Sequence, residues 1–133
     1  MSRFGTRAIV ATQAPLSVCW EAARQALEFE RAKPRVEGAA MRGRVGSFLK
    51  TRLIGGAFVS ENTIPMDVTV SVVDLGNQRH VVIDVGEAVG FGLLIGMEGK
   101  TRHRSETLAA ELQSLVGQRL PGSMPVAPTY SPA

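Results

Sequence analysis

The sequence contains a single cysteine, Cys19, among its 133 residues. An intramolecular disulfide is therefore excluded, and cysteine usage gives no sign of an oxidising compartment. Long apolar runs are also missing, because no stretch reaches the roughly 18 residues that a membrane-spanning helix requires. The apolar centre of the opening stretch, "AIVA", is too short for a secretory signal. These absences predict a cytoplasmic protein without a membrane span.

Lysine and aromatic residues are scarce. Three lysines accompany twelve arginines at a formal net charge of +3. Planar arginine forks suit phosphate or carboxylate recognition, although a genome rich in arginine codons gives the same count. In the basic stretch 31–52, Phe48 is the only ring on which a base could stack. This scarcity disfavours binding of single-stranded nucleic acid, which uses aromatic stacking platforms.

Motifs for phosphate binding and catalysis are absent as well. The stretch "GFGLLIGMEGKT", residues 90–101, ends in Gly-Lys-Thr ahead of a helical pattern. A Walker A loop needs glycine where Leu94 stands, and a dinucleotide fingerprint needs glycine where Ile95 stands. No nucleophile signature is present, and the helical pair His103 and Glu106 lacks a third metal ligand. The sequence therefore gives little support for an enzyme and predicts neither a metal nor a cofactor.

Two amphipathic helices and several strands are indicated by periodicity. Residues 7–13 form a β-branched run that predicts a first strand. A helix follows Pro15 and is expected to end near residues 29–32, because Lys33 precedes a proline. The apolar stripe of this helix consists of Leu16, Trp20, Ala23 and Leu27. A second helix begins near residue 100, and its stripe consists of Leu108, Leu112, Leu115 and Val116.

The segment from about residue 64 to 87 predicts a β-hairpin closed by Gly76 and Asn77, a pair suited to a type II′ turn. An opposite-charge pair, Asp74 and Arg79, then flanks the turn. One face pairs Val72 with Val81, Val70 with Ile83 and Val68 with Val85, and the other pairs Val73 with His80, Ser71 with Val82 and Thr69 with Asp84. A slip of one residue would destroy the uniformly apolar face, so the register is strongly specified.

Together these elements predict an α+β fold in the order β-α-β-β-β-β-α. A mostly antiparallel, curved sheet of about five strands is expected to pack against a long C-terminal helix. Residues 1–120 form the single domain of this prediction. Residues 121–133 contain four prolines and no charge, which predicts an extended, mobile tail.

The glycine-rich apolar segment 90–97 is the principal candidate for a binding site. Its residues either fill the core, line the mouth of a hydrophobic pocket, or form a patch for a protein partner or a second copy of the chain. We interpret the protein as a non-enzymatic binding protein for an apolar ligand or a protein partner. The candidate residues are Phe91, Leu93, Leu94, Ile95 and Met97, with Trp20 and Phe58 as cavity walls.

Two further interpretations stay open. The first is a basic module that binds nucleic acid or another anion, for which Arg42 and Arg44 would point the same way from one strand. Its candidate residues are Arg42, Arg44, Arg52 and Lys100. The second is a structural subunit of a larger assembly, in which the apolar segment 90–97 would be an interface.

The stretch "IVATQAPLSVCWEAARQALEF", residues 9–29, resembles the start of the START-like helix-grip superfamily. In that superfamily an opening strand runs into an A-P-x-x-V-W turn and a helix. The matching residues here are Ala14, Pro15, Val18 and Trp20, with Cys19 inserted between the last two. The resemblance implies a sheet that grips the last helix around an apolar cavity for lipids, quinones or polyketides. This chain has fewer expected strands than that fold and lacks its second small helix.

Overall fold

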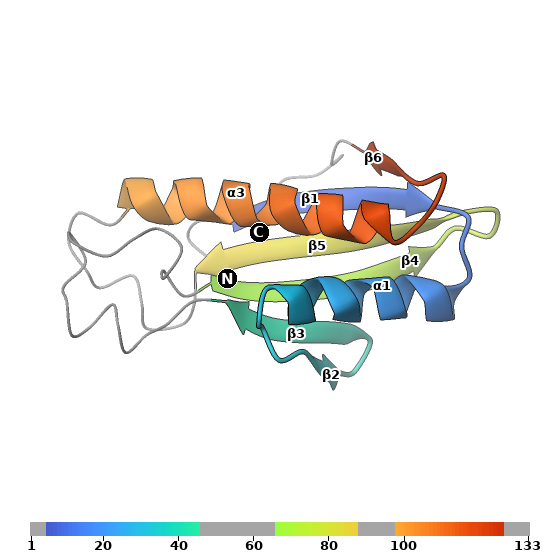
Figure 1. Ribbon diagram of the computed structural model, residues 1–133, viewed down its shortest axis with the longest axis horizontal. Coiled ribbons are helices and arrows are strands. Elements are labelled where there is room, and N and C mark those ends of the chain that lie inside the picture. Colours follow the sequence, from blue (N-terminus) through green and yellow to red (C-terminus); the bar gives the residue numbers. More distant parts are fainter. Residues whose placement is uncertain (1–4, 46–65, 88–97, 127–133) are drawn as a thin grey trace.

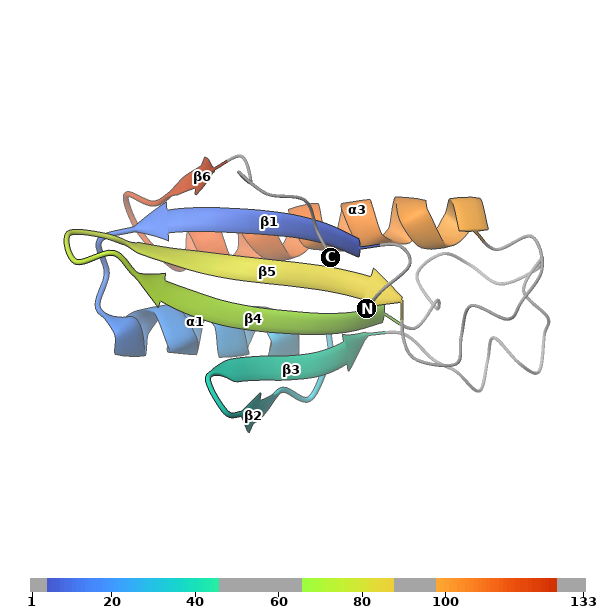
Figure 2. The ribbon, with the colours of Figure 1, turned by 180° about the vertical axis from the view of Figure 1, so that it is seen from behind.

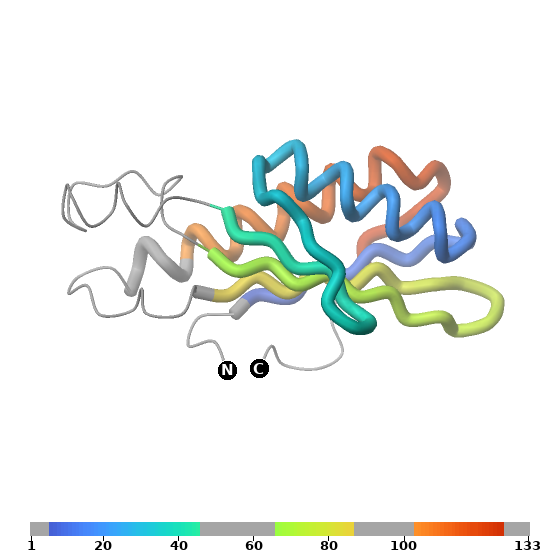
Figure 3. Tube along the Cα trace, turned by 90° about the horizontal axis from the view of Figure 1, so that it is seen from below, coloured from blue at the N-terminus to red at the C-terminus, as the bar shows by residue number. Residues whose placement is uncertain are grey.

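The computed structural model describes residues 5–45, 66–87 and 98–126, with two layers of secondary structure (Figure 1). In chain order the elements are β1 (Gly5–Thr12), α1 (Leu16–Phe29), β2 (Arg35–Glu37), β3 (Ala40–Val45), β4 (Met66–Asp74), β5 (Arg79–Glu87), α3 (Glu98–Gln118) and β6 (Met124–Val126). Both helices cover the same face of one sheet, and the opposite face, seen in Figure 2, carries neither of them. Figure 3 shows the two layers from the side.

The strands form an antiparallel sheet in the order β2-β3-β4-β5-β1-β6. The predicted α+β class and antiparallel sheet are confirmed. The described residues form six strands instead of about five, and one stretch for which the sequence predicts a strand, residues 48–60, lies outside them. One additional strand arises because residues 35–45 fold back on themselves at Gly38, whose positive φ of 61° suits a tight turn. The other is β6, which pairs with β1 and follows α3, so the long helix is not the last element.

The β4–β5 hairpin has the register that the sequence predicts. Val72 faces Val81 and Val70 faces Ile83, with Asp74 opposite Arg79 beside the turn. Gly76 has φ +91° at the first turn position, where a type II′ turn needs a residue with positive φ. The backbone N–H of Gly76 donates to the Asp74 carboxylate at 2.9 Å, which further fixes the turn. The valine-rich face lies against the helices and forms the centre of the core.

Helix α1 has the predicted position, but its buried stripe is shifted from the predicted one. Leu16 is exposed and Trp20 only partly buried. The buried residues are Cys19, Ala22, Ala23, Ala26 and Leu27. Small side chains at these positions let the helix axis approach the sheet closely, and the larger Trp20 packs at the margin of this contact. The helix ends before Arg31 and Lys33, both of which have positive φ.

Helix α3 buries Leu108, Leu112 and Val116 as predicted, with Leu115 partly buried beside them. Within the segment 121–133, for which the sequence predicts an extended tail, Met124–Val126 form β6, and residues 127–133 lie outside the described part. No helix among the described residues is both long and apolar enough to cross a membrane.

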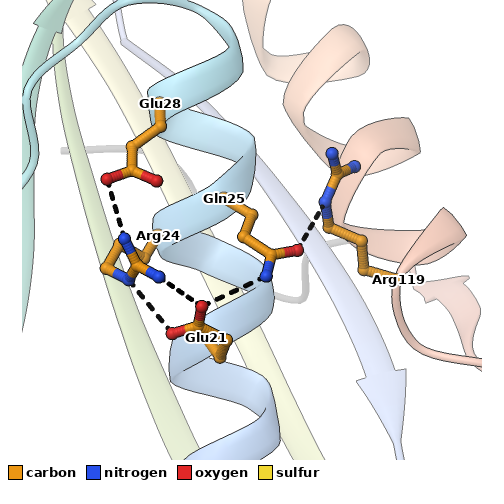
Figure 4. Close-up of polar contacts among 5 residues, drawn as sticks. All are labelled: Glu21, Arg24, Gln25, Glu28 and Arg119. Atoms are coloured by element: carbon orange, nitrogen blue, oxygen red, sulfur yellow. Dashed lines mark hydrogen bonds and ion pairs between the residues drawn. The ribbon is translucent and has the colours of Figure 1, made fainter.

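A polar network joins the exposed sides of the two helices (Figure 4). Arg24 contacts the carboxylates of Glu21 and Glu28 within α1, and the second contact measures 2.7 Å. Gln25 donates to Glu21 at 3.1 Å and accepts from the Nε of Arg119, beyond the end of α3, at 3.1 Å. Exposed contacts of this kind contribute little energy individually, so the packing of the apolar faces stabilises the fold more than this network does.

Gly43 allows β3 to pass close to the segment that follows α1. A Cβ at this position would lie 2.9 Å from the Cβ of Ala32 and 3.2 Å from its carbonyl oxygen. We therefore expect Gly43→Ala to lower the free energy of unfolding by about 1–3 kcal/mol, as overpacking does, when measured by urea denaturation. In the control Gly117→Ala the nearest atom is 3.7 Å away, and stability should stay the same or rise by up to about 1 kcal/mol. An unchanged free energy of unfolding in Gly43→Ala would contradict this close approach.

Candidate functional site

Strands β3 and β5 end, and β4 begins, at the same end of the sheet, which we call the loop end. In the register, Val45 at the end of β3 is opposite Met66 at the start of β4, and Met66 is opposite Glu87 at the end of β5 (Figure 1). The connections 46–65 and 88–97 therefore both join the sheet at the loop end. The opposite end carries the β4–β5 turn.

Most residues of the predicted apolar site lie outside the described part of the chain. These are Phe58, Phe91, Leu93, Leu94, Ile95 and Met97. Trp20 is described, in the second turn of α1. Its helix begins beside the start of β5, because Arg79 Nη1 donates to the carbonyl oxygen of Ala14 at 3.1 Å. Trp20 therefore lies nearer to the β4–β5 turn than to the loop end. It is distant from the end of β5, which leads into the segment 90–97.

A buried arginine, Arg104, lies on the inner face of α3 near the loop end. Only 4% of its surface is exposed. Its Nη1 is 3.9 Å from an oxygen of Glu111, and its Nε has no hydrogen-bond partner within the described residues. Burial of a guanidinium without full pairing is costly, which distinguishes Arg104 from the paired surface arginines. The sequence carries a weak signal for it, a charge four residues before Leu108 on the apolar stripe.

The neighbouring Ser105 fixes where this turn of α3 sits on the sheet. The hydroxyl oxygens of Ser105 and Thr6 are 2.9 Å apart. Thr6 pairs with Val85, two residues before the end of β5. Because Arg104 is adjacent to Ser105 in the same helical turn, its backbone is anchored over the loop end of the sheet.

Two glutamates from different helices accompany Arg104. Glu30 follows the last residue of α1, and Glu111 lies two turns after Arg104 in α3. Burial raises the pKa of the Glu30 carboxyl, repulsion from Glu111 and a hydrogen bond to it raise it further, and the Arg104 charge opposes these effects. The neutral form of the Glu30 carboxyl is therefore favoured relative to an exposed glutamate.

We expect this arrangement to appear in the pH dependence of stability. Because the pKa of Glu30 in the folded protein lies above its ordinary value of 4.5, the unfolded chain loses its proton first as pH rises. The stabilising contribution of protonated Glu30 is complete below about pH 4.5 and is lost through the folded pKa. Glu30→Gln removes this loss, so its stability relative to the unmodified protein should increase as pH rises across that interval.

The measurement is urea denaturation of both proteins at several pH values from about 4 to 7. Glu111→Gln is the matched control. Removal of the repelling carboxylate should bring the folded pKa of Glu30 closer to its unfolded pKa, so the pH interval over which stability is lost should narrow. Parallel stability curves for Glu30→Gln and the unmodified protein would contradict the raised pKa of Glu30, and an unchanged interval in Glu111→Gln would contradict the coupling between the two glutamates.

The predicted anion-binding arginines lie on the helix-free face of the sheet. Arg42 and Arg44 stand two residues apart on β3, and both are exposed. Arg44 Nε is 2.9 Å from a carboxylate oxygen of Asp67, and Arg42 Nε is 3.9 Å from one of Glu37. Asp84 on the same face binds Arg7 through both carboxylate oxygens. The fourth candidate, Arg52, lies outside the described residues, and Lys100 belongs to the first turn of α3, where its side chain is not described.

Cys19 and Arg79 lie at the opposite end from Arg104. Burial raises the pKa of the Cys19 thiol, so it stays protonated and unreactive at neutral pH. Arg79 Nη1 donates to the carbonyl oxygens of Gln13 and Ala14 at 3.2 and 3.1 Å, which uses this arginine to hold the chain before α1. These contacts serve structure rather than chemistry.

Potential metal ligands do not gather within the described residues, where no group of three or more His, Cys, Asp or Glu could hold a metal ion. The feature of the described chain that most resembles a ligand site is therefore Arg104 with Glu30 and Glu111 at the loop end. No protein-family model matches this chain, and a search among curated proteins gave no significant match.

Proposed function

We propose that the protein is a small, non-enzymatic binding protein that takes an apolar ligand at the loop end. The observation that supports this most directly is the shared anchoring of the connections 46–65 and 88–97. Between them they contain Phe58 and the apolar run 91–97. Two apolar connections that join the sheet at the same end of its strands can contribute to one binding surface.

Close packing in the rest of the core favours the loop end as the place where a ligand binds. The middle of the sheet is already filled by close packing, since Val68, Val81 and Ile83 are fully buried against the helices. A ligand in that region would have to displace packed side chains, which costs several kcal/mol. Space for a ligand is more readily provided where the strands end.

The START-like resemblance belongs to this proposal. A sheet covered by a helix from the C-terminal part of the chain is the arrangement that the resemblance implies, and it brings the same class of apolar ligand. The chain departs from that pattern in ending its described part with β6 after α3. The resemblance is therefore an additional reason for testing lipid-like molecules first.

A basic module for nucleic acid is less well supported. On the helix-free face, Arg42 and Arg44 each have a carboxylate within 4 Å. Glu37, Asp67 and Asp84 would repel a polyphosphate that approached these arginines. Net positive potential, which dominates affinity for nucleic acid, is weakened where acidic side chains alternate with basic ones.

The proposal predicts that Leu94→Asp abolishes binding of 1-dodecanol without unfolding the protein. A buried aspartate would repel an apolar ligand, whereas a residue at a binding surface is not needed for the fold. Binding is measured by isothermal titration calorimetry and the fold by circular dichroism. The matched control is Leu75→Asp, since Leu75 is exposed beside the β4–β5 turn. This variant should bind 1-dodecanol as tightly as the unmodified protein.

Global unfolding of Leu94→Asp would assign Leu94 to the core and contradict the proposed site. Equal affinity in both variants and the unmodified protein would contradict it as well. A complex of the unmodified protein with another protein, in place of dodecanol binding, would show that the apolar segment is a partner interface.

A further inference from the structure

We propose that strand β2 is a docking edge for a second copy of this chain, with which it pairs antiparallel about a two-fold axis through Val36. Strand β2 is the outermost strand on one side of the sheet, and among the described strands it pairs with β3 alone. This inference is independent of the proposed ligand site. All the residues on which it depends belong to the described part of the chain.

The backbone groups of Val36 point away from the sheet. In β3, the N–H of Arg44 donates to the carbonyl oxygen of Ala32 at 3.4 Å, so the backbone groups of Arg44 point toward the β2 side. Because hydrogen-bonded and non-hydrogen-bonded pairs alternate along an antiparallel ladder, Arg42 and Ala40 also point toward β2. Their partners lie on either side of Val36, which therefore directs its N–H and C=O to the open edge.

A two-fold axis through Val36 brings complementary side chains together. Strand β2 consists of Arg35, Val36 and Glu37, so each Arg35 lies opposite the Glu37 of the second copy. The two Val36 residues lie opposite each other and exchange two backbone hydrogen bonds. Opposite charges and β-branched side chains placed directly across an antiparallel pair stabilise it. Strand β2 is therefore complementary to itself.

The side chains of β2 are accessible for this contact. Val36 is 73% exposed, more than any other large apolar residue of the described chain. The Arg35 side chain is 76% exposed and approaches Glu37 of its own chain only to 3.7 Å. Its neighbour across the ladder is Arg42, which carries a like charge and does not neutralise it. The second copy would supply a carboxylate directly opposite Arg35.

The other edge of the sheet is less suited to pairing. Strand β6 contains Pro125, which has no N–H to donate, between two residues without charge. Strand β2 contains no proline, and its charges disfavour any partner or register that places like charges opposite each other. Because three residues bury little surface, we expect a reversible dimer with a dissociation constant of roughly 0.1–1 mM.

Sedimentation equilibrium at protein concentrations on both sides of that dissociation constant measures the association. Arg35→Glu and Glu37→Arg should each weaken the dimer at least about tenfold, because both charge pairs become like-charge pairs. The control Arg119→Glu changes the net charge as Arg35→Glu does, at a residue beyond the end of α3. Its dissociation constant should stay within about twofold of the unmodified protein's.

An equal mixture of Arg35→Glu and Glu37→Arg is the sharpest test. In the mixed pair the two introduced charges lie opposite each other, as do the two native ones, so the mixture should associate about as tightly as the unmodified protein. The double variant Arg35→Glu/Glu37→Arg restores both pairs within one chain. It should also dimerise, and it replaces the mixture if a single variant fails to fold.

The backbone contact has its own test. Val36→Pro removes the N–H that points to the open edge and should abolish association without changing the circular dichroism. Val36→Ala keeps this N–H and should still associate. A monomer at every concentration, a dimer that Arg35→Glu leaves unchanged, or a mixture that fails to associate would each overturn the proposal.

Discussion

Replacing Arg104 by methionine and Glu111 by leucine in one double variant is expected to raise the free energy of unfolding of the ligand-free protein by about 1–4 kcal/mol, the range found when both partners of a buried ion pair are exchanged for apolar residues. Methionine has a similar length and can fill an irregular space. The exchange removes the desolvation cost of a guanidinium that is 4% exposed and loosely paired. Glu30 stays behind, and burial, which raises the pKa of its carboxyl, favours the neutral form there.

Urea denaturation followed by circular dichroism measures this difference, with Arg35→Met as the matched control. The side chain of Arg35 is 76% exposed, so its replacement should change stability by less than about 0.5 kcal/mol. A loss of more than about 1 kcal/mol in the double variant would indicate that the folded protein pairs this arginine well. In that case its burial would reflect structural use and not a ligand site. A gain would show that the buried guanidinium lowers the stability of the ligand-free fold.

Replacing Ile83 by alanine is expected to lower the free energy of unfolding by about 2–5 kcal/mol, the cost of removing a large aliphatic side chain from a core. Ile83 lies in the middle of β5, fully buried, opposite Val70 on one side and Ala8 on the other. Both helices pack on this face, so the space left behind has little freedom to collapse.

The control for Ile83→Ala is Val73→Ala in the other strand of the same hairpin. Val73 is on the helix-free face and 45% exposed, so its truncation should cost less than about 1 kcal/mol, mainly through strand propensity. The same urea titrations measure both variants. Similar losses at the two positions would contradict the assignment of one face to the core and the other to the surface.

The hairpin could be predicted from the sequence because two constraints agreed. Gly76 and Asn77 restrict the turn to few geometries, and the alternation of valines permits only one register with an apolar face. Either constraint alone would have left several registers possible. Their agreement explains why the predicted pairs of β4 and β5 are those of the structure.

The short strands β2 and β6 could not be predicted, since three residues carry no recognisable period. Their pairing depends on neighbours, namely the Gly38 turn and the exposed edge of β1. In α1 the predicted stripe is confirmed at Ala23 and Leu27 and wrong at Leu16, which is exposed. Trp20 has the largest apolar side chain of its helix, but close packing against the sheet favours the small residues Ala22, Ala23 and Ala26.

The Arg104 cluster could not be predicted because its members are distant in sequence. Glu30 and Arg104 are brought together only when α1 ends beside α3. A charge on an apolar stripe is a weak signal, because long side chains often reach solvent from such positions. Of the predicted anion site, Arg42 and Arg44 do share a face, but the carboxylates beside them are contributed by β2 and β4.

The location of the ligand is the central question, and amide chemical shifts of the ¹⁵N-labelled protein during titration with 1-dodecanol test it most directly. A site at the loop end predicts the largest changes at Thr6, Val85 and Arg104, with little change at Gly76 beside the distant turn. Changes concentrated on the helix-free face around Arg42, or no changes at all, would contradict a ligand site at the loop end.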